Sequence, residues 1–138
     1  MLDKLDFELA GKTLVIVSSC LVIFHVANLL GYVPHNITWL GQIDSNRTML
    51  IMGFVSIALN LLVILCALTK CKFWSSASFN SIVEKILPFV FWWLVGNTIA
   101  NLFAKSKFEV VVFTPILIVL TVCMYRLKTH SEVSATHD

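Results

Sequence analysis

Charged residues are scarce in this 138-residue chain, and their scarcity excludes most soluble folds. Asp, Glu, Lys and Arg together make up 13% of the sequence, whereas 58% is hydrophobic, and the mean hydropathy is +0.87. A soluble domain is about 25% charged and about 45–50% apolar. A water-soluble domain of this length has too little interior to hide so much apolar surface. Lipid is therefore the solvent expected for most of the chain.

The sequence also lacks the patterns of two other protein classes. Its net charge is only +2, and the basic residues lie at the ends of hydrophobic runs rather than in a stripe, which excludes a nucleic-acid partner. The chain has no C-x-x-C pair, so a membrane thiol oxidoreductase is not expected. The four cysteines are instead expected to pack as small hydrophobic residues. They are Cys20, Cys66, Cys71 and Cys123.

Titratable groups are nearly absent from the middle of the hydrophobic runs. His25 is the exception, and a four-helix haem protein would need paired axial histidines. A proton-coupled exporter is expected to carry a carboxylate at membrane depth, and Glu84 and Glu109 are both assigned to helix starts. The sequence therefore predicts no catalytic residue, no cofactor and no metal site, and an enzyme is the less expected class.

The hydrophobic residues fall into four runs that match membrane-spanning helices. Each run has about 20 residues, which at about 1.5 Å per residue crosses a hydrocarbon core of about 30 Å. Before the runs, residues 1–12 are expected to form an interfacial lead-in, and after them residues 128–138 a polar cytoplasmic tail. The predicted fold is an all-α bundle of four transmembrane helices within residues 13–127, at 13–32, 48–69, 82–103 and 107–127.

Two capping-box patterns mark expected helix starts. Ser106-Lys107-Phe108-Glu109 follows the third run directly, and a serine three residues before a glutamate can satisfy the free amides of a helix N-terminus. The third and fourth helices are therefore expected to form a hairpin with a short turn. Ser81 and Glu84 have the same spacing and predict that the third helix begins near residue 82.

Polar side chains recur on one face of each of three predicted helices. Residues three, four or seven apart share a helix face, and Trp93 extends one of these faces by a turn. Small residues such as Gly53 allow helices to approach closely in a membrane. The polar face residues are Ser18, His25 and Asn28 in the first helix, Ser56 and Asn60 in the second, and Asn97 and Asn101 in the third.

The distribution of lysine and arginine predicts the orientation. Cytoplasmic loops of membrane proteins carry an excess of these residues. If both termini are cytoplasmic, the outer segments hold three basic residues, and the other seven are inside. The inner residues are Lys4, Lys12, Lys70, Lys72, Lys85, Arg126 and Lys128, and the outer ones are Arg47, Lys105 and Lys107.

Several of these residues also stand in a pattern that covers nearly the whole chain. The pattern resembles an uncharacterised family of small four-span bacterial integral membrane proteins, although Leu40-Gly41 stands where that family has Gly-Gly. The resemblance implies a bacterial cytoplasmic-membrane protein and assigns no functional residue. It is carried by His25-x-x-x-Leu29-Leu30-Gly31-x-x-Pro34, Ile37-x-Trp39-x-Gly41-x-Ile43, Met49, Ser56-Ile57-x-x-Asn60-Leu61, Asn97-Thr98-x-x-Asn101-Leu102, Glu109 and Thr114-Pro115.

Two functional hypotheses follow from the polar faces. In the first, the polar groups hydrogen-bond across helices, and the protein is a membrane subunit, scaffold or self-associating interaction protein. Gly53-x-x-Ser56 would then offer a close helix contact. In the second, His25 and the membrane asparagines line a cavity, and the protein binds or transports a small molecule or an ion. The expected partners are the lipid bilayer and a second copy or another membrane protein.

Overall fold

A computed structural model of the chain consists of helices and connecting turns. It describes residues 6–33, 46–72 and 77–135. The helices are α1 (Phe7–Leu29), α2 (Asn46–Lys70) and α3 (Ala77–Leu102), followed by a π-helical turn, η4 (Glu109–Phe113), that runs directly into α4 (Thr114–Ala135). All four long helices are long and apolar enough to cross a membrane. The predicted all-α four-helix fold is confirmed, and the four candidate spans point to a multi-pass membrane protein.

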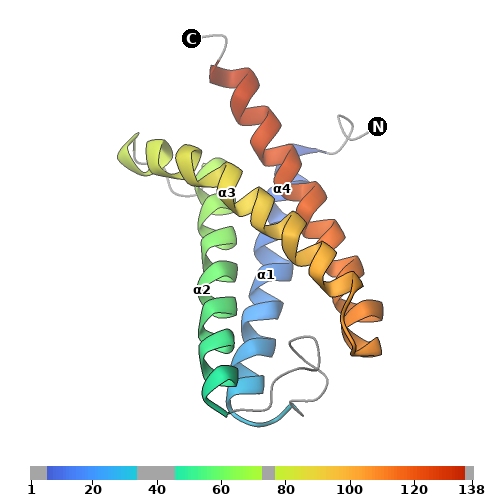
Figure 1. The fold of residues 1–138 in the computed structure, drawn as a ribbon. Helices are drawn as coiled ribbons and strands as arrows, with labels where there is room; N and C mark the ends of the chain where they lie inside the picture. Colours follow the sequence, from blue (N-terminus) through green and yellow to red (C-terminus); the bar gives the residue numbers. More distant parts are fainter. Residues whose placement is uncertain (1–5, 34–45, 73–76, 136–138) are drawn as a thin grey trace.

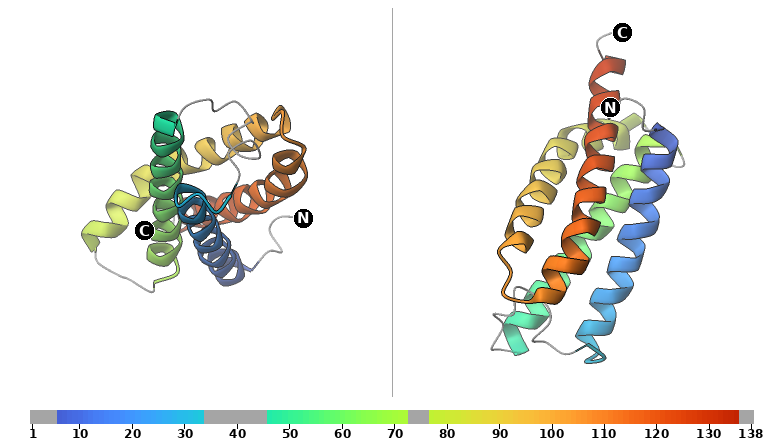
Figure 2. Two further views of the ribbon diagram at one scale, coloured as in Figure 1. Left: turned by 90° about the horizontal axis from the view of Figure 1, so that it is seen from below. Right: turned by 90° about the vertical axis from the view of Figure 1, so that its right-hand side faces the viewer.

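The helices form two antiparallel pairs that are close at one end and diverge at the other. α1 packs against α2 and α4, and α3 packs against α4 and α2, so that α1 and α3 stand on a diagonal. The start of α1 and the end of α4 lie at the same end of the bundle (Figure 1). At the opposite end the α1–α2 pair separates from the α3–α4 pair, which Figure 2 shows in the view from below.

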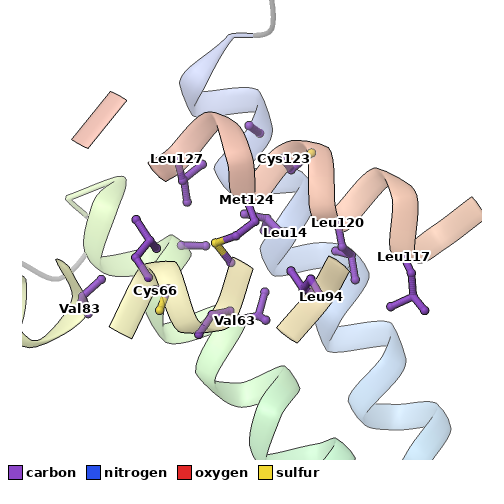
Figure 3. Packing of buried hydrophobic residues seen from close by; sticks show 14 of the residues in the cluster. Leu14, Val63, Cys66, Val83, Leu94, Leu117, Leu120, Cys123, Met124 and Leu127 are labelled. Carbon is purple, nitrogen blue, oxygen red and sulfur yellow. The ribbon is translucent and has the colours of Figure 1, made fainter. Parts of the chain in front are cut away.

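The apolar core occupies the end at which the pairs are close. Its buried residues lie between Ala10 and Leu21 in α1, Val63 and Ala67 in α2, Val83 and Leu94 in α3, and Leu117 and Leu127 in α4. Figure 3 shows their side chains pointing toward one another from all four helices. Leu14, Val63, Met124 and Leu127 are fully buried. Burial of side chains of this size stabilises this half of the bundle through close packing.

Glycines permit the close approach of α1 and α2. Gly53 of α2 faces the side chain of Leu29, and a Cβ atom on Gly53 would lie 2.9 Å from Leu29 Cγ, with a still closer approach to one Leu29 methyl group. At the other end of the pair, Gly11 of α1 packs against the Sγ atom of Cys71 in the same way. The small-residue contact predicted at Gly53 is therefore made within the chain.

The outer limits of α1 and α4 lie beyond the predicted spans. Asp6 caps α1 by accepting a hydrogen bond from the Glu8 amide at 3.3 Å, so residues 7–12 are continuous with the rest of α1. α4 continues to Ala135, so most of the predicted tail is helical. α1 ends in a Schellman motif, in which Gly31 has a φ of +81° and the Tyr32 amide donates to the Ala27 carbonyl at 3.0 Å.

The predicted start of the third helix is wrong. α3 already begins at Ala77, so Ser81 lies inside the helix and does not cap it. Glu84 instead forms an ion pair with Lys70 of α2, with Lys70 Nζ 3.0 Å from Glu84 Oε1. A capping-box pattern needs only two residues, and here α3 begins four residues before Ser81. The residues of the resemblance within 34–45 lie outside the described part of the chain.

Candidate functional site

A cavity of about 280 Å³ lies between the helices in the half of the bundle where the two pairs diverge. Its walls come from the second half of α1, the first half of α2, the second half of α3, η4 and the start of α4. Leu21, Leu94, Leu117 and Leu120 belong both to the apolar core and to the cavity wall. They form the boundary between a tightly packed half of the bundle and a hollow half.

Polar side chains from α1, α2, α3 and η4 line this cavity. Of the seven polar residues predicted from the sequence, five contribute to its wall, whereas Ser18 and Asn28 do not. Both of these are fully buried in α1, away from the cavity. Their exclusion shows that sharing a helix face with His25 in sequence spacing does not bring a side chain into the cavity wall. The polar wall consists of His25, Ser56, Asn60, Asn97, Asn101 and Glu109.

The asparagine amides at the cavity bond to their own helices. Asn60 Nδ2 donates to the Ser56 carbonyl at 2.9 Å, and Asn101 Nδ2 donates to the Asn97 carbonyl at 2.9 Å and to Asn97 Oδ1 at 3.4 Å. Among the described residues, these three asparagines make no hydrogen bond to another helix. The packing hypothesis assigns these amides the role of connecting the helices. The hydrogen bonds show that they do not have this role.

Glu109 lines the cavity and is only 5% exposed. The Glu109 amide donates to Ser106 Oγ at 3.4 Å, which is the serine half of the predicted capping box. The chain is helical again from Lys107, so the turn after α3 is short, as the sequence predicts. The sequence spacing predicts only that Glu109 stands at a helix start, and it carries no signal that this residue belongs to the cavity wall. The cavity therefore contains an acidic group.

The π-helical turn η4 shapes the wall beside Glu109. Within it, the Thr114 amide donates to the Glu109 carbonyl, five residues earlier instead of four. Pro115 explains the wider turn, because it has no amide hydrogen and its ring crowds the carbonyl four residues before it. Single π-helical turns of this kind frequently occur at functional sites. The Thr114-Pro115 pair is the sequence signal that marks this position.

Aromatic side chains form a further part of the wall. Phe24 of α1 and Phe113 of η4 meet edge to face, with 5.1 Å between their ring centroids. Trp93 of α3 lies on the same helix face as Asn97 and also lines the cavity, as the spacing of the two residues indicates. The site thus combines amides, a hydroxyl, an imidazole and a carboxylate with three aromatic rings.

No protein family, characterised protein or solved structure matches this chain significantly.

Proposed function

We propose that this multi-pass membrane protein binds or transports a small polar solute in the cavity between its four helices. The observation that carries the proposal is the convergence of six polar side chains from α1, α2, α3 and η4 on one cavity of about 280 Å³. Such a volume is close to the lower end of the range for small-molecule sites, about 300–1,000 Å³. Polar residues at membrane depth are costly and commonly mark a solute pathway.

The hydrogen bonds support a binding role over a packing role. Polar side chains that fix helix packing in a membrane bond across helices. The asparagines of the cavity bond within their own helices instead. Close packing is supplied by the apolar core at the other end of the bundle (Figure 3). The asparagine amides are therefore not required to hold the helices together.

The scaffold hypothesis receives less support. Its sequence basis was the polar stripe and the small-residue contact at Gly53. That contact is occupied by Leu29 of the same chain, so Gly53 does not offer a surface to a second copy. Self-association through another face stays a prediction from the sequence.

We place the protein in a bacterial cytoplasmic membrane with both termini in the cytoplasm. The resemblance described above supports the membrane, and the excess of basic residues on one side supports the orientation. In this orientation the apolar core lies in the inner half of the bilayer and the cavity in the outer half. Arg47, Lys105 and Lys107 lie at the cavity end and are exposed.

Thiol labelling tests whether the cavity is filled with water. In the full chain, reconstituted in lipid nanodiscs with its four native cysteines replaced by alanine, Ser56→Cys places a thiol in the cavity wall. Ser18→Cys is the matched control, because Ser18 is fully buried and lies outside the cavity. We expect a neutral, water-soluble methanethiosulfonate reagent to label the Ser56→Cys variant and to leave the Ser18→Cys variant unlabelled.

If both variants are monodisperse and folded and neither thiol is labelled, the proposal is contradicted, because the cavity is then closed to water. Equal labelling of both thiols contradicts it as well, since access would then reflect a loose bundle. Applying a charged, membrane-impermeant reagent from one side of sealed vesicles tests the orientation. Labelling of the Ser56→Cys variant from the outer face alone is the result that the proposed topology predicts.

A further inference from the structure

Two buried asparagines in the cavity wall have carbonyl oxygens that accept no hydrogen bond. Asn60 of α2 is 6% exposed and Asn101 of α3 is 9% exposed, and both line the cavity. Each bonds to its own helix through Nδ2, whereas neither Oδ1 atom accepts a hydrogen bond from any residue that the structure describes. A buried acceptor normally has a partner, because leaving it unsatisfied is costly. The two carbonyls therefore present acceptors to the contents of the cavity.

Asn97 adds a donor to these two acceptors. It lies one turn before Asn101 on α3 and lines the same cavity. Its Oδ1 atom accepts from Asn101 Nδ2 at 3.4 Å, and its own Nδ2 group makes no hydrogen bond within the described part of the chain. His25 and Glu109 also line the wall, but both take part in other interactions within the protein. The asparagines thus offer two carbonyl acceptors and one amide donor.

These amide groups favour an uncharged solute. A hydroxyl or amide group that leaves water regains its hydrogen bonds from neutral partners of this kind, whereas an ion loses hydration that neutral dipoles replace only in part. An anion would also find no lysine or arginine among the described residues of the wall. Because two of the three open groups are acceptors, the solute must supply donors.

The rest of the wall suits the carbon skeleton of a small molecule. The rings of Phe24, Trp93 and Phe113 reach the cavity from α1, α3 and η4. Ligand sites commonly combine such an apolar wall with a few polar groups that fix the orientation of the ligand. The volume of about 280 Å³ is close to the lower limit of about 300 Å³ for such sites, so the solute is small.

We propose that the cavity selects a small uncharged solute that donates hydrogen bonds, such as a carboxamide or a polyol. Its N–H or O–H groups bond to the Oδ1 atoms of Asn60 and Asn101, and Asn97 Nδ2 donates to an oxygen atom of the same solute. This inference rests on the proposed function, since it names the class of solute for the same cavity. A solute that only accepts hydrogen bonds leaves both carbonyls unpaired and binds more weakly.

Protection of the Ser56→Cys thiol from the neutral reagent tests this selection on the full chain in nanodiscs. The probe is acetamide, and its matched control is N,N-dimethylacetamide, in which methyl groups replace both N–H donors and the carbonyl is kept. At about ten times its Kd, acetamide is expected to slow labelling about tenfold, because the free fraction of sites falls in that proportion. At the same concentration N,N-dimethylacetamide should slow labelling less than about twofold, since losing two hydrogen bonds weakens binding more than about tenfold.

Variants of the asparagines then assign the effect to their carbonyls. Asn60→Leu and Asn101→Leu each remove one Oδ1 acceptor, and each is expected to lower the affinity for acetamide about fivefold, as the loss of one neutral hydrogen bond does. Asn80→Leu is the matched control, because Asn80 belongs to the same helix as Asn101 and does not line the cavity. Its affinity should equal that of the parent. Protection is measured against each variant's own labelling rate without probe, so a slower baseline does not count as protection.

The outcomes separate this inference from the proposed function. If the Ser56→Cys thiol is labelled but acetamide gives no protection, the inference is wrong and the water-filled cavity stands. Equal protection by N,N-dimethylacetamide, or an unchanged affinity for acetamide in either asparagine variant, overturns it as well. Stronger protection by methylammonium chloride overturns it in favour of a charged solute. If the Ser56→Cys thiol is not labelled at all, the proposed function fails and the inference fails with it.

Discussion

The hydroxyl oxygens of Thr98 and Thr121 lie 3.2 Å apart and connect α3 to α4. These threonines were not among the polar residues singled out from the sequence, yet their side chains make a contact between helices. Asn60 and Asn101 were singled out, and they bond within their own helices beside the cavity. Thr98 and Thr121 therefore connect two helices, whereas the amides of Asn60 and Asn101 bond within their own.

Replacing Thr121 with valine is expected to destabilise the protein slightly. The change removes one partner of the contact between α3 and α4, and an interhelical hydrogen bond in a membrane contributes on average about 0.6 kcal/mol. Thr129→Val is the control, because the Thr129 hydroxyl bonds only within α4, to Tyr125 and Arg126. A double-mutant cycle with Thr98→Val measures the coupling, and a coupling energy of zero would contradict the contact.

Adding a methyl group at Gly53 is expected to destabilise the α1–α2 pair. The new Cβ atom would overlap the Leu29 side chain, and forcing extra atoms into a packed contact costs about 1–3 kcal/mol. Gly96→Ala is the matched control, because nothing lies within 4 Å of a Cβ atom at Gly96. Thermal unfolding should show a lower Tm for Gly53→Ala and an unchanged or higher Tm for Gly96→Ala. Equal Tm values would mean that α1 and α2 are not in this close contact.

The ion pair between Lys70 and Glu84 is expected to contribute little. The Glu84 side chain is 52% exposed, and exposed ion pairs contribute about 0–1 kcal/mol. Glu84→Gln should therefore lower the free energy of unfolding by less than about 1 kcal/mol, and added salt should reduce the difference. A larger loss that is insensitive to salt would show that the pair fixes the angle between α2 and α3.

Apolar substitution of cavity amides should spare stability and impair solute access. Asn60→Leu removes an amide that bonds only to the Ser56 carbonyl, so no contact between helices is lost. We expect a free energy of unfolding within about 1 kcal/mol of the parent and slower labelling of the Ser56→Cys thiol, because the wall becomes less polar. A large loss of stability with unchanged labelling would support the packing hypothesis instead.

The sequence predicts the four spans because lipid imposes strict conditions on a backbone. Unsatisfied peptide groups are too costly in hydrocarbon, so each apolar run of sufficient length must become a helix. Helix ends are less well determined, because a local pattern can be overridden by its surroundings. The pattern at Ser81 and Glu84 illustrates this, since α3 begins at Ala77 and Glu84 pairs with Lys70.

The cavity could be predicted only in part. Spacing along a helix places His25, Asn60 and Asn97 on polar faces, but it does not fix which faces meet or at what depth. Ser18 and Asn28 accordingly belong to the predicted face but do not line the cavity. Glu109 was assigned by its cap position alone, because its place in the wall depends on how α3 and η4 pack against α1 and α2. That packing is a tertiary property.

Contact between water and the asparagine amides is the most direct test of the account. In water-edited solid-state NMR of the full chain in lipid, with 15N-labelled asparagine, the side-chain signals of Asn60, Asn97 and Asn101 should build up rapidly after transfer of magnetisation from water. Asn28, which is fully buried outside the cavity, should build up slowly. Slow build-up of all four signals would show a dry bundle interior and would contradict a solute-binding cavity.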